Sequence, residues 1–413
     1  MFDLLRTMRL AGRYRWRWFL LPVLLCCAVF IADAIAGRFV PSNSRSLSTR
    51  SVRTLALREY PPNLDTVVAP SEAYVAKSQG LSFSPKTLRT DEAGFISPPK
   101  SQTVLHGPDI IFFGGSTTEC LYVEEENRFP ARVAELLQRA DGGAVRTANA
   151  GVSGNHCIDS LLALIGKGIP AKPRVVVLME CFKDLSFLSE SGSYWDLPPS
   201  RQILQNPAVF QAPPAPFKAW LRSTAEMVAP NLFRIALASS TKLAIFFDSS
   251  VSLTAMDEAW HEAASARSVP LETCVAQFSS SLASFVRVAR AWGITPVLMT
   301  QFNRLRPQDD FVRREYEKNP GGIPYQEFIG RYSLFNETVR EVARKEGCLL
   351  VDLDRDLQPA ADYLYDFVNL NDAGSLQVAT LVSRTLVEHQ PQFWKLRDPQ
   401  DKPPRNSVST SSE

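Results

Sequence analysis

The sequence predicts an α/β fold in which helices cover both faces of a parallel sheet. Five short apolar runs have the length of strands, they alternate with longer helical patterns, and most are continuously apolar. Continuously apolar strands are typical of sheets that are buried on both faces, and strand–helix alternation is typical of parallel, doubly wound sheets. Ligands of such sheets bind beyond the carboxyl ends of the strands.

The expected elements lie between residues 109 and 387. The strands are expected at 109–113, 145–150, 174–180, 295–301 and 348–354. The helices are expected at 131–139, 158–165, 276–292, 334–345 and 373–387. The alternation breaks after the third strand, where residues 186–270 form an insertion. Insertions at this edge of a sheet often form lids or substrate walls, so a lid-like segment is expected.

The amino-acid composition excludes few functions, but it indicates the class of protein. Of the 413 residues, 45% are hydrophobic and 21% are charged, which is typical of a globular protein with a full core. The net charge of +2 is spread without the basic face that nucleic acid requires, so nucleic-acid binding is not expected.

The N-terminal region predicts a membrane anchor. Residues 18–36 are apolar except for Asp33, and 19 helical residues span roughly 28 Å, close to the hydrocarbon thickness of a bilayer. Positive charge on the cytoplasmic side predicts a cytoplasmic N-terminus and an extracytoplasmic C-terminal domain. The preceding arginines are Arg6, Arg9, Arg13, Arg15 and Arg17. A cleaved signal peptide is the alternative, because "AIA" precedes Gly37, but the long arginine-rich start favours an uncleaved anchor.

These features divide the chain into five parts. A basic cytoplasmic N-terminus (1–17) and a transmembrane anchor (18–36) come first, and a Ser/Arg-rich linker (37–69) follows. The α/β domain is expected at 70–395, and the tail at 396–413 has the composition of a disordered segment.

The seven cysteines do not indicate a metal site. The sequence has no C-x-x-C pair, and the spacing around His156 matches no ligand pattern, so no metal or organic cofactor is expected. Buried free thiols are the default, and a Cys157–Cys181 disulfide is the alternative.

Motifs follow four of the expected strands. "DIIFFGGSTTEC" (109–120) is an apolar run that stops at two glycines and then offers Ser116. "NAGVSGN" ends the second strand, "ECFKDL" ends the third, and "YDFVNLNDAG" follows the fifth. In this order the motifs resemble the SGNH/GDSL hydrolase superfamily, which consists of esterases and acyl hydrolases on a three-layer, flavodoxin-like sheet. The motif Phe-Gly-Gly-Ser-Thr-Thr is similar to that of its membrane-anchored bacterial branch, and the resemblance covers about 105–388.

The resemblance implies roles for particular residues. Ser116 stands at the position of the nucleophile, and its N–H would help to bind an oxyanion. Gly154 matches a second oxyanion donor, and the adjacent Asn155 is counted with the binding residues. In the third block, Lys183 replaces the family's oxyanion asparagine, while Asp184 is kept.

The general base of the family is missing. Its last block reads Asp-x-x-His, and here it reads Asp366-Phe367-Val368-Asn369. An amide accepts a hydrogen bond but takes no proton near pH 7, and losing the base of a triad costs on the order of 10⁴ to 10⁶ in turnover. Lys183 is a milder departure, because an ammonium can donate to an oxyanion, although its chain is flexible.

Four histidines are the candidates for a substitute base. His106 and His389 are excluded, because each lies roughly 20 Å or more from the expected site. His156 lies two residues after Gly154 at the correct edge, so it is the candidate substitute, and His261 lies in the insertion.

The sequence therefore predicts a single-pass protein of the bacterial inner membrane with its domain on the periplasmic side. It would bind an acylated, glycan-linked or lipid-linked ligand with weak or no ester hydrolysis. The first alternative is an active ester hydrolase or O-acyl (acetyl) transferase that uses Ser116 with a substitute base. The second is a structural scaffold, which the exposed serine of an intact Gly-Gly-Ser-Thr-Thr turn argues against.

Overall fold

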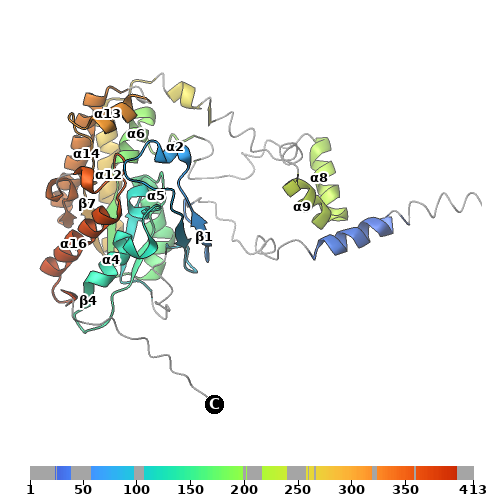
Figure 1. The fold of residues 1–413 in the computed structure, drawn as a ribbon, viewed down its shortest axis with the longest axis horizontal. Coiled ribbons are helices and arrows are strands. Elements are labelled where there is room, and N and C mark those ends of the chain that lie inside the picture. The colour runs from blue at the N-terminus through green and yellow to red at the C-terminus, as the bar shows by residue number, and fades with distance from the viewer. Residues whose placement is uncertain are drawn as a thin grey trace, which may run out of the picture. The chain divides into compact units, whose positions relative to one another are not determined.

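The chain forms two compact units in the computed structural model (Figure 1). Unit 1 comprises Met1–Ala56 and Pro198–Glu262, and unit 2 comprises Leu57–Leu197 and Ala263–Glu413. The residues that the structure describes are 24, 26–38, 57–96, 107–198, 201, 216–239, 257–258, 260–264, 267–318, 323–357 and 360–397.

The centre of unit 2 is a five-stranded parallel sheet. Its strand order is β5-β3-β6-β7-β8, which is the 2-1-3-4-5 order of flavodoxin-like sheets. The strands are β3 (Ile110–Gly114), β5 (Thr147–Asn149), β6 (Val175–Met179), β7 (Thr295–Met299) and β8 (Leu349–Val351). All five expected strands are present, so the predicted α/β class with a parallel sheet is confirmed.

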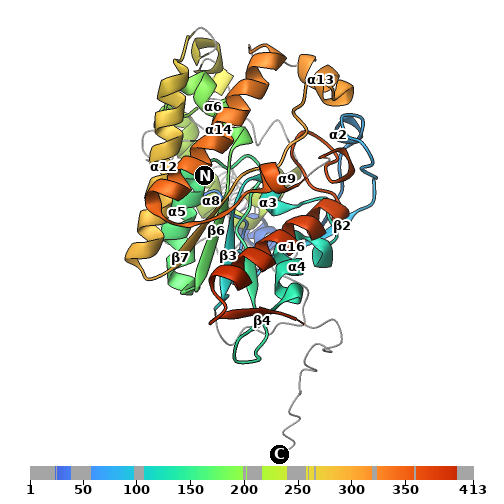
Figure 2. The ribbon, with the colours of Figure 1, turned by 90° about the vertical axis from the view of Figure 1, so that its left-hand side faces the viewer.

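Helices cover both faces of this sheet, because alternate residues of each strand point to opposite sides. On β3, Phe112 packs edge to face on Phe129 with 5.3 Å between ring centroids, whereas Phe113 packs on Phe285 of the other layer at 5.5 Å. The Phe129 layer consists of α4 (Phe129–Leu136) and α16 (Asp372–His389), visible in front of the sheet in Figure 2. The opposite layer consists of α5 (Cys157–Ala163), α12 (Leu271–Ala291) and α14 (Tyr325–Glu346).

Smaller elements complete unit 2. Two antiparallel pairs join β1 (Asp65–Val68) to β2 (Lys86–Arg89) and β4 (Leu137–Arg139) to β9 (Trp394–Leu396). The short helices are α2 (Glu72–Val75), α3 (Ser116–Glu119), α6 (Phe182–Ser191), α13 (Asp310–Glu317) and α15 (Leu353–Asp356). The sequence pattern missed α6, because it lies at the start of the expected insertion.

Two expected boundaries need correction. The linker expected at 37–69 includes β1, whose pairing with β2 makes 57–69 part of the folded unit. The insertion expected at 186–270 is shorter, because α6 and Tyr194 are packed in unit 2 and the change of unit comes at Pro198.

The described helical segments of unit 1 include residues 26–36, α8 (Pro216–Val228) and α9 (Pro230–Ser239). None of the helices within the described ranges combines the length and the apolar composition needed to cross a membrane. Residues 18–23 and 25 of the expected span lie outside the described residues.

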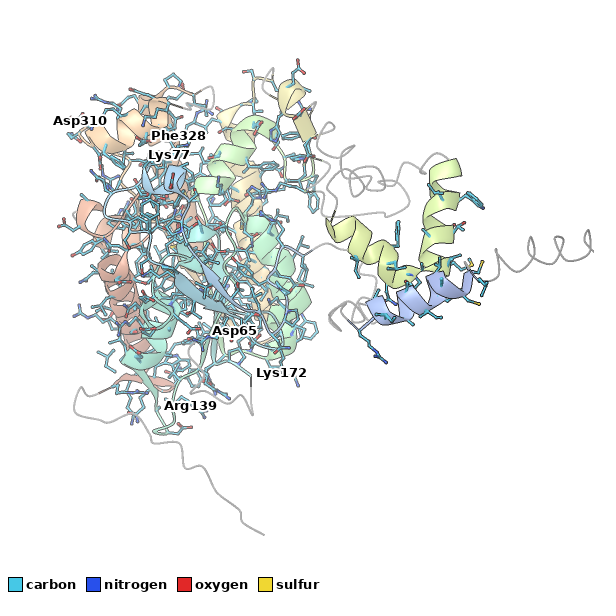
Figure 3. All side chains as sticks on the ribbon, turned by 45° about the vertical axis from the view of Figure 1, so that its right-hand side comes forward. Asp65, Lys77, Arg139, Lys172, Asp310 and Phe328 are labelled. Atoms are coloured by element: carbon cyan, nitrogen blue, oxygen red, sulfur yellow. The ribbon has the colours of Figure 1, made fainter. Side chains whose placement is uncertain are left out.

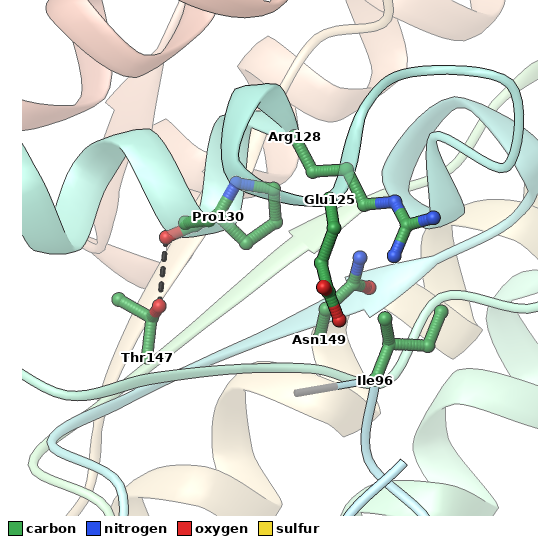
Figure 4. A pocket seen from close by; sticks show the side chains of 7 residues that line it. Ile96, Glu125, Arg128, Pro130, Thr147 and Asn149 are labelled. Atoms are coloured by element: carbon green, nitrogen blue, oxygen red, sulfur yellow. Dashed lines mark hydrogen bonds between the residues drawn. The ribbon is translucent and has the colours of Figure 1, made fainter. Parts of the chain in front are cut away.

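A cavity of about 10 Å³ lies beside β5 in unit 2 (Figure 4). Glu125, Arg128, Thr147 and Asn149 line it, and its size is about that of one water molecule. Burial raises the pKa of Glu125 and lowers that of Arg128. This cavity is too small for a substrate.

Candidate functional site

A tight turn presents Ser116 at the carboxyl end of β3. A Cβ on Gly114 would lie 2.2 Å from Thr118 Oγ1 and 2.5 Å from the Met179 carbonyl oxygen, so only glycine fits there. Ser116 is the first residue of α3 and is half-buried. The wholly buried strand and the glycine together fix this serine at the sheet edge where α/β proteins bind ligands.

A second loop holds the predicted acid and the residue in place of the base. Asp366 Oδ1 accepts hydrogen bonds from the N–H groups of Val368 (3.0 Å) and Asn369 (2.7 Å). Its Oδ2 accepts from Asn369 Nδ2 (2.7 Å) and from the Tyr74 hydroxyl of α2 (2.9 Å). Asn369 is buried, and its Oδ1 has no hydrogen-bond partner among the described residues. The amide thus has one end fixed by the carboxylate and one acceptor left over.

One side chain joins this loop to the serine turn. Thr117 Oγ1 donates to the Val368 carbonyl (3.3 Å) and accepts from Gln301 Nε2 (2.8 Å). Ser116 and Asn369 each lie one residue from that contact. The two positions therefore lie near each other at the same edge of the sheet.

The loop of Gly154 lies on another side of the serine turn. The Val152 N–H donates to the Gly114 carbonyl (3.1 Å), which fixes the loop beside the turn. Gly154 has a φ of +77°, and its carbonyl accepts from Arg58 Nη1 at 2.5 Å. Asn155 is wholly buried, and neither amide atom of its side chain has a hydrogen-bond partner among the described residues. Arg58 comes from the segment expected as linker, so no sequence pattern indicated its place beside the site.

Glu119 fixes that loop to α3. This carboxylate is buried and accepts hydrogen bonds from the Tyr60 hydroxyl (2.5 Å), from the Ser153 N–H (3.1 Å) and from the Ser153 hydroxyl. Four acceptor positions are available to an ionised carboxylate, so one side chain can satisfy three donors. The last residue of the Gly-Gly-Ser-Thr-Thr-Glu motif therefore holds the neighbouring loop in place.

His156, the predicted substitute base, is buried at the start of α5. Its Nδ1 lies 3.0 Å from Asp159 Oδ2, and its ring packs on Phe187 at 4.6 Å and near Tyr194 at 6.5 Å. Burial raises the pKa of Asp159, but the hydrogen bond and charge of His156 outweigh that effect and lower it. These contacts hold the ring toward α6, and proton transfer between His156 and Ser116 stays a prediction.

The third motif places its lysine and its aspartate in opposite environments. Lys183 is exposed in the first turn of α6, with Nζ 5.8 Å from the centroid of the Phe182 ring. Asp184 is wholly buried, and its Oδ1 accepts from the Cys157 N–H (2.8 Å) and from the Tyr194 hydroxyl. Asp184 thus joins the start of α5 to α6, while the lysine extends from the surface.

Glu180 is a buried carboxyl to which the sequence motifs assign no role. It follows β6, accepts from Ser160 Oγ (2.9 Å), and its Oε2 would lie 3.5 Å from a Cβ on Gly115. Burial, followed by the charge of Asp184, raises the pKa of Glu180 well above its ordinary value. Burial raises the pKa of Asp184 to about 7. The position of Glu180 at a strand end is the signal that could have found it.

Gln301 likewise has no role in the sequence motifs. Besides Thr117, it binds the Phe182 N–H and the Tyr332 hydroxyl, each at 2.8 Å from its Oε1. One buried amide therefore ties together α3, α6 and α14 around the site.

The structure describes two of the other three histidines. His261 belongs to unit 1, with its ring 5.0 Å from that of Trp260, and the exposed His389 ends α16. His106 lies outside the described residues.

The Cys157–Cys181 disulfide, the alternative that the sequence left open, is wrong. Both thiols are free and buried. The Cys157 thiol lies against Ser281 and the Cys181 thiol lies against Tyr332, so the two do not pair. Burial raises the pKa of both thiols, so they behave as small apolar groups.

Solved structures similar to this chain are hydrolases. A lipase/acylhydrolase from Enterococcus faecalis is 14% identical, with 70% of this chain and 99% of that one covered and a TM-score of 0.38. Axe2, an acetylxylan esterase from Geobacillus stearothermophilus, is 16% identical (69% and 96% covered, TM-score 0.35). A lipolytic protein of the G-D-S-L family from Desulfitobacterium hafniense is 14% identical (67% and 98% covered, TM-score 0.35).

No family model and no curated protein matches the chain. The likeness to these solved structures is remote. The strand order of the sheet, rather than that likeness, establishes the fold.

Proposed function

We propose that this chain is an SGNH hydrolase-like protein that binds an acylated ligand and hydrolyses it weakly or not at all. The observation that carries the proposal is the Asp366–Asn369 pair beside the serine turn. In a working triad the acid holds the base, and the base accepts the serine proton. Here the acid is held by four donors, but the residue that it orients is an amide.

The free acceptor of Asn369 defines what the pair can do. Its Oδ1 can accept a hydrogen bond from the Ser116 hydroxyl, which would orient the serine without removing its proton. A serine that keeps its proton is a weak nucleophile. The site then recognises a ligand instead of turning it over.

An active ester hydrolase or O-acyl transferase is the second candidate, and Glu180 favours it. This carboxyl lies beside Gly115, and burial raises its pKa well above its ordinary value. In that case activity rises with pH as Glu180 loses its proton. His156 remains the other candidate base for this function.

The chain carries out this function at the outer face of a bacterial inner membrane. Five arginines followed by the apolar residues 18–36 support an N-terminal anchor. The acylated partner would be a glycan or a lipid-linked molecule at that face.

Labelling of the full chain with a fluorophosphonate probe separates the two candidates. For a binding protein we expect no labelling above that of Ser116→Ala, because the serine is not activated. Labelling that Ser116→Ala abolishes would reject the binding function in favour of the active enzyme. Loss of that labelling in Glu180→Gln, with retention in His156→Gln, would identify Glu180 as the base.

Ligand binding is tested separately by calorimetry with O-acetylated and deacetylated forms of one oligosaccharide. The proposal predicts tighter binding of the acetylated form, and weaker binding of that form by Ser116→Val. Equal affinity for the two forms would contradict recognition of the acyl group.

A further inference from the structure

Asp33, the one charge in the apolar N-terminal segment, is buried against the insertion. Its Oδ1 accepts hydrogen bonds from the backbone N–H groups of Asn231 and Leu232, each at 2.8 Å. Its Oδ2 accepts from Asn231 Nδ2 at 3.1 Å. All of these donors lie in the first turn of α9, and only 8% of Asp33 is exposed.

The contact is an N-cap supplied from another part of the chain. The first N–H groups of a helix have no partner within the helix, and a side-chain oxygen usually satisfies them. Ala229 precedes α9 and has no such oxygen. Asp33 takes that place, and the positive end of the helix dipole favours its charge. The segment 26–36 and α9 are therefore held together by the residue that would otherwise be most costly in an apolar segment.

The large apolar side chains of the same helices are exposed. Eight of the sixteen large hydrophobic side chains that are exposed in the described ranges belong to these helices: Leu24, Phe30, Ile31, Ile35, Trp220, Met227, Val228 and Ile235. An apolar hollow of about 480 Å³ between α8 and α9 is lined by residues such as Leu221, Val228 and Phe233. Figure 3 shows the segment 26–36 (blue) alongside α8 and α9 (yellow-green). In a water-soluble helical unit, apolar side chains are mostly buried and charged side chains are exposed. These helices show the reverse, with a buried charge and exposed apolar side chains.

We infer that α8 and α9 are embedded in the lipid bilayer together with the N-terminal segment, so that the insertion is part of the anchor. This inference rests on the proposed membrane anchoring. The occupant of the apolar surface is the acyl-chain region of the bilayer, because the segment 26–36 continues an apolar run that follows five arginines. Because Asp33 hydrogen-bonds the first turn of α9, insertion of that apolar run into the bilayer brings α9 to the membrane as well.

The lengths of the helices define how deeply they lie. α8 has 13 residues and α9 has 10, which correspond to roughly 20 Å and 15 Å, so neither crosses a bilayer of about 30 Å. Both helices therefore enter one leaflet, as amphipathic interfacial helices do. The lid expected from the sequence is replaced by a second membrane contact.

Quenching by brominated lipids tests the inference on the full chain in phosphatidylethanolamine/phosphatidylglycerol vesicles. Trp220 is 59% exposed in α8, and Trp292, which is 66% exposed in unit 2, supplies the matched control. We expect brominated acyl chains to quench part of the tryptophan fluorescence. Trp220→Phe should remove part of that quenching, and Trp292→Phe should leave all of it. Equal quenching in the wild type and in Trp220→Phe would overturn the inference.

A carbonate wash of the same vesicles separates this failure from failure of the anchor. A chain that stays with the vesicles while Trp220 is not quenched keeps its anchor, and only the embedding of the insertion is rejected. A chain that the wash removes has no anchor, and both statements are then rejected.

The cap itself is tested by Asp33→Ala with Asp33→Asn as control. Tryptic cleavage within α8 and α9 should rise by roughly two- to thirtyfold in Asp33→Ala, because an N-cap is lost. Asp33→Asn keeps an acceptor oxygen and should rise less, while both variants stay with the vesicles. Unchanged cleavage in Asp33→Ala would show that Asp33 does not hold the insertion.

Discussion

The buried carboxyl groups on the two sides of the serine turn differ in how many hydrogen bonds they accept. On one side, Asp366 has both oxygens engaged and accepts four hydrogen bonds. On the other side, Asp184 uses only Oδ1, its buried Oδ2 has no partner among the described residues, and Glu180 lies next to it. Hydrogen bonds stabilise a carboxylate, whereas burial without enough donors stabilises the protonated acid.

One side of the turn therefore holds its groups in place by hydrogen bonds, whereas the other side holds the carboxyl groups that are candidates for proton transfer. The side of Asp366 pairs the acid with an amide beside the serine turn. The side of Glu180 and Asp184 has carboxyl groups with raised pKa values but lacks the family's arrangement. The chemistry of the site depends on which side controls the Ser116 hydroxyl.

The largest expected effect comes from Asn369→His. A histidine at this position could donate to Asp366 and accept the serine proton, so hydrolysis of p-nitrophenyl acetate should rise on the order of 10²-fold or more. Initial rates across the pH range measure the gain, which should follow a histidine-like titration.

Asn369→Gln is the matched control, because it enlarges the side chain without adding a base. Its rate should equal that of the wild type. If the hydrolysis rate rose equally in both variants, the cause would be a changed pocket volume rather than a restored base. If the rate did not rise in a folded Asn369→His, the triad-like placement would be rejected.

The next largest effect is expected from substitutions of the two adjacent glycines. Gly114→Ala places a Cβ 2.2 Å from Thr118 Oγ1, whereas Gly115→Ala meets nothing closer than 3.5 Å. We expect Gly114→Ala to lower the free energy of unfolding by about 3 kcal/mol or more, and Gly115→Ala by much less. Urea denaturation of both variants measures the difference. Equal losses would mean that the turn is not as tight as described.

The unpaired side of Asp184 predicts a pH dependence. Its pKa is raised from 3.8 to about 7, so between these values the unfolded chain is ionised while the folded chain keeps the proton. Asp184 therefore lowers stability as pH rises through that window, by about 1.4 kcal/mol per pKa unit as an upper limit. Asp184→Asn should show a flatter decline in the free energy of unfolding between about pH 4 and about pH 7. Parallel curves for the two proteins would contradict the raised pKa.

The smallest effect is expected from Tyr74→Phe. The variant removes the Tyr74 hydroxyl, which donates to Asp366 Oδ2 and accepts from Asn369 Nδ2 at 3.3 Å, while Asp366 Oδ2 still accepts from Asn369 Nδ2. The expected loss is about 1 kcal/mol in the free energy of unfolding. In the background of Asn369→His the same change should raise the apparent pKa of the new base only slightly. A loss of several kcal/mol would mean that Tyr74 holds the loop by more than this bond.

Much of the fold could be predicted from the sequence, because strand and helix periodicity are local properties. The run before Gly114 is apolar throughout and is buried on both faces, and the glycine pair and Ser116 stand at its end. The order of the motifs likewise predicts that Ser116, Gly154 and Asn369 lie at one sheet edge. The chemical nature of Asn369, an amide without basicity, is also a property of the sequence alone.

Only the tertiary structure decided which distant groups meet. Tyr74 reaches Asp366 across 292 positions of the chain, Gln301 reaches Thr117 across 184, and Asp33 caps α9 from 198 residues away. Such pairs leave no periodic signal, because their spacing is set by the packing of whole elements. The same holds for Glu180 and Asp184, whose raised pKa values come from burial that no local sequence pattern specifies.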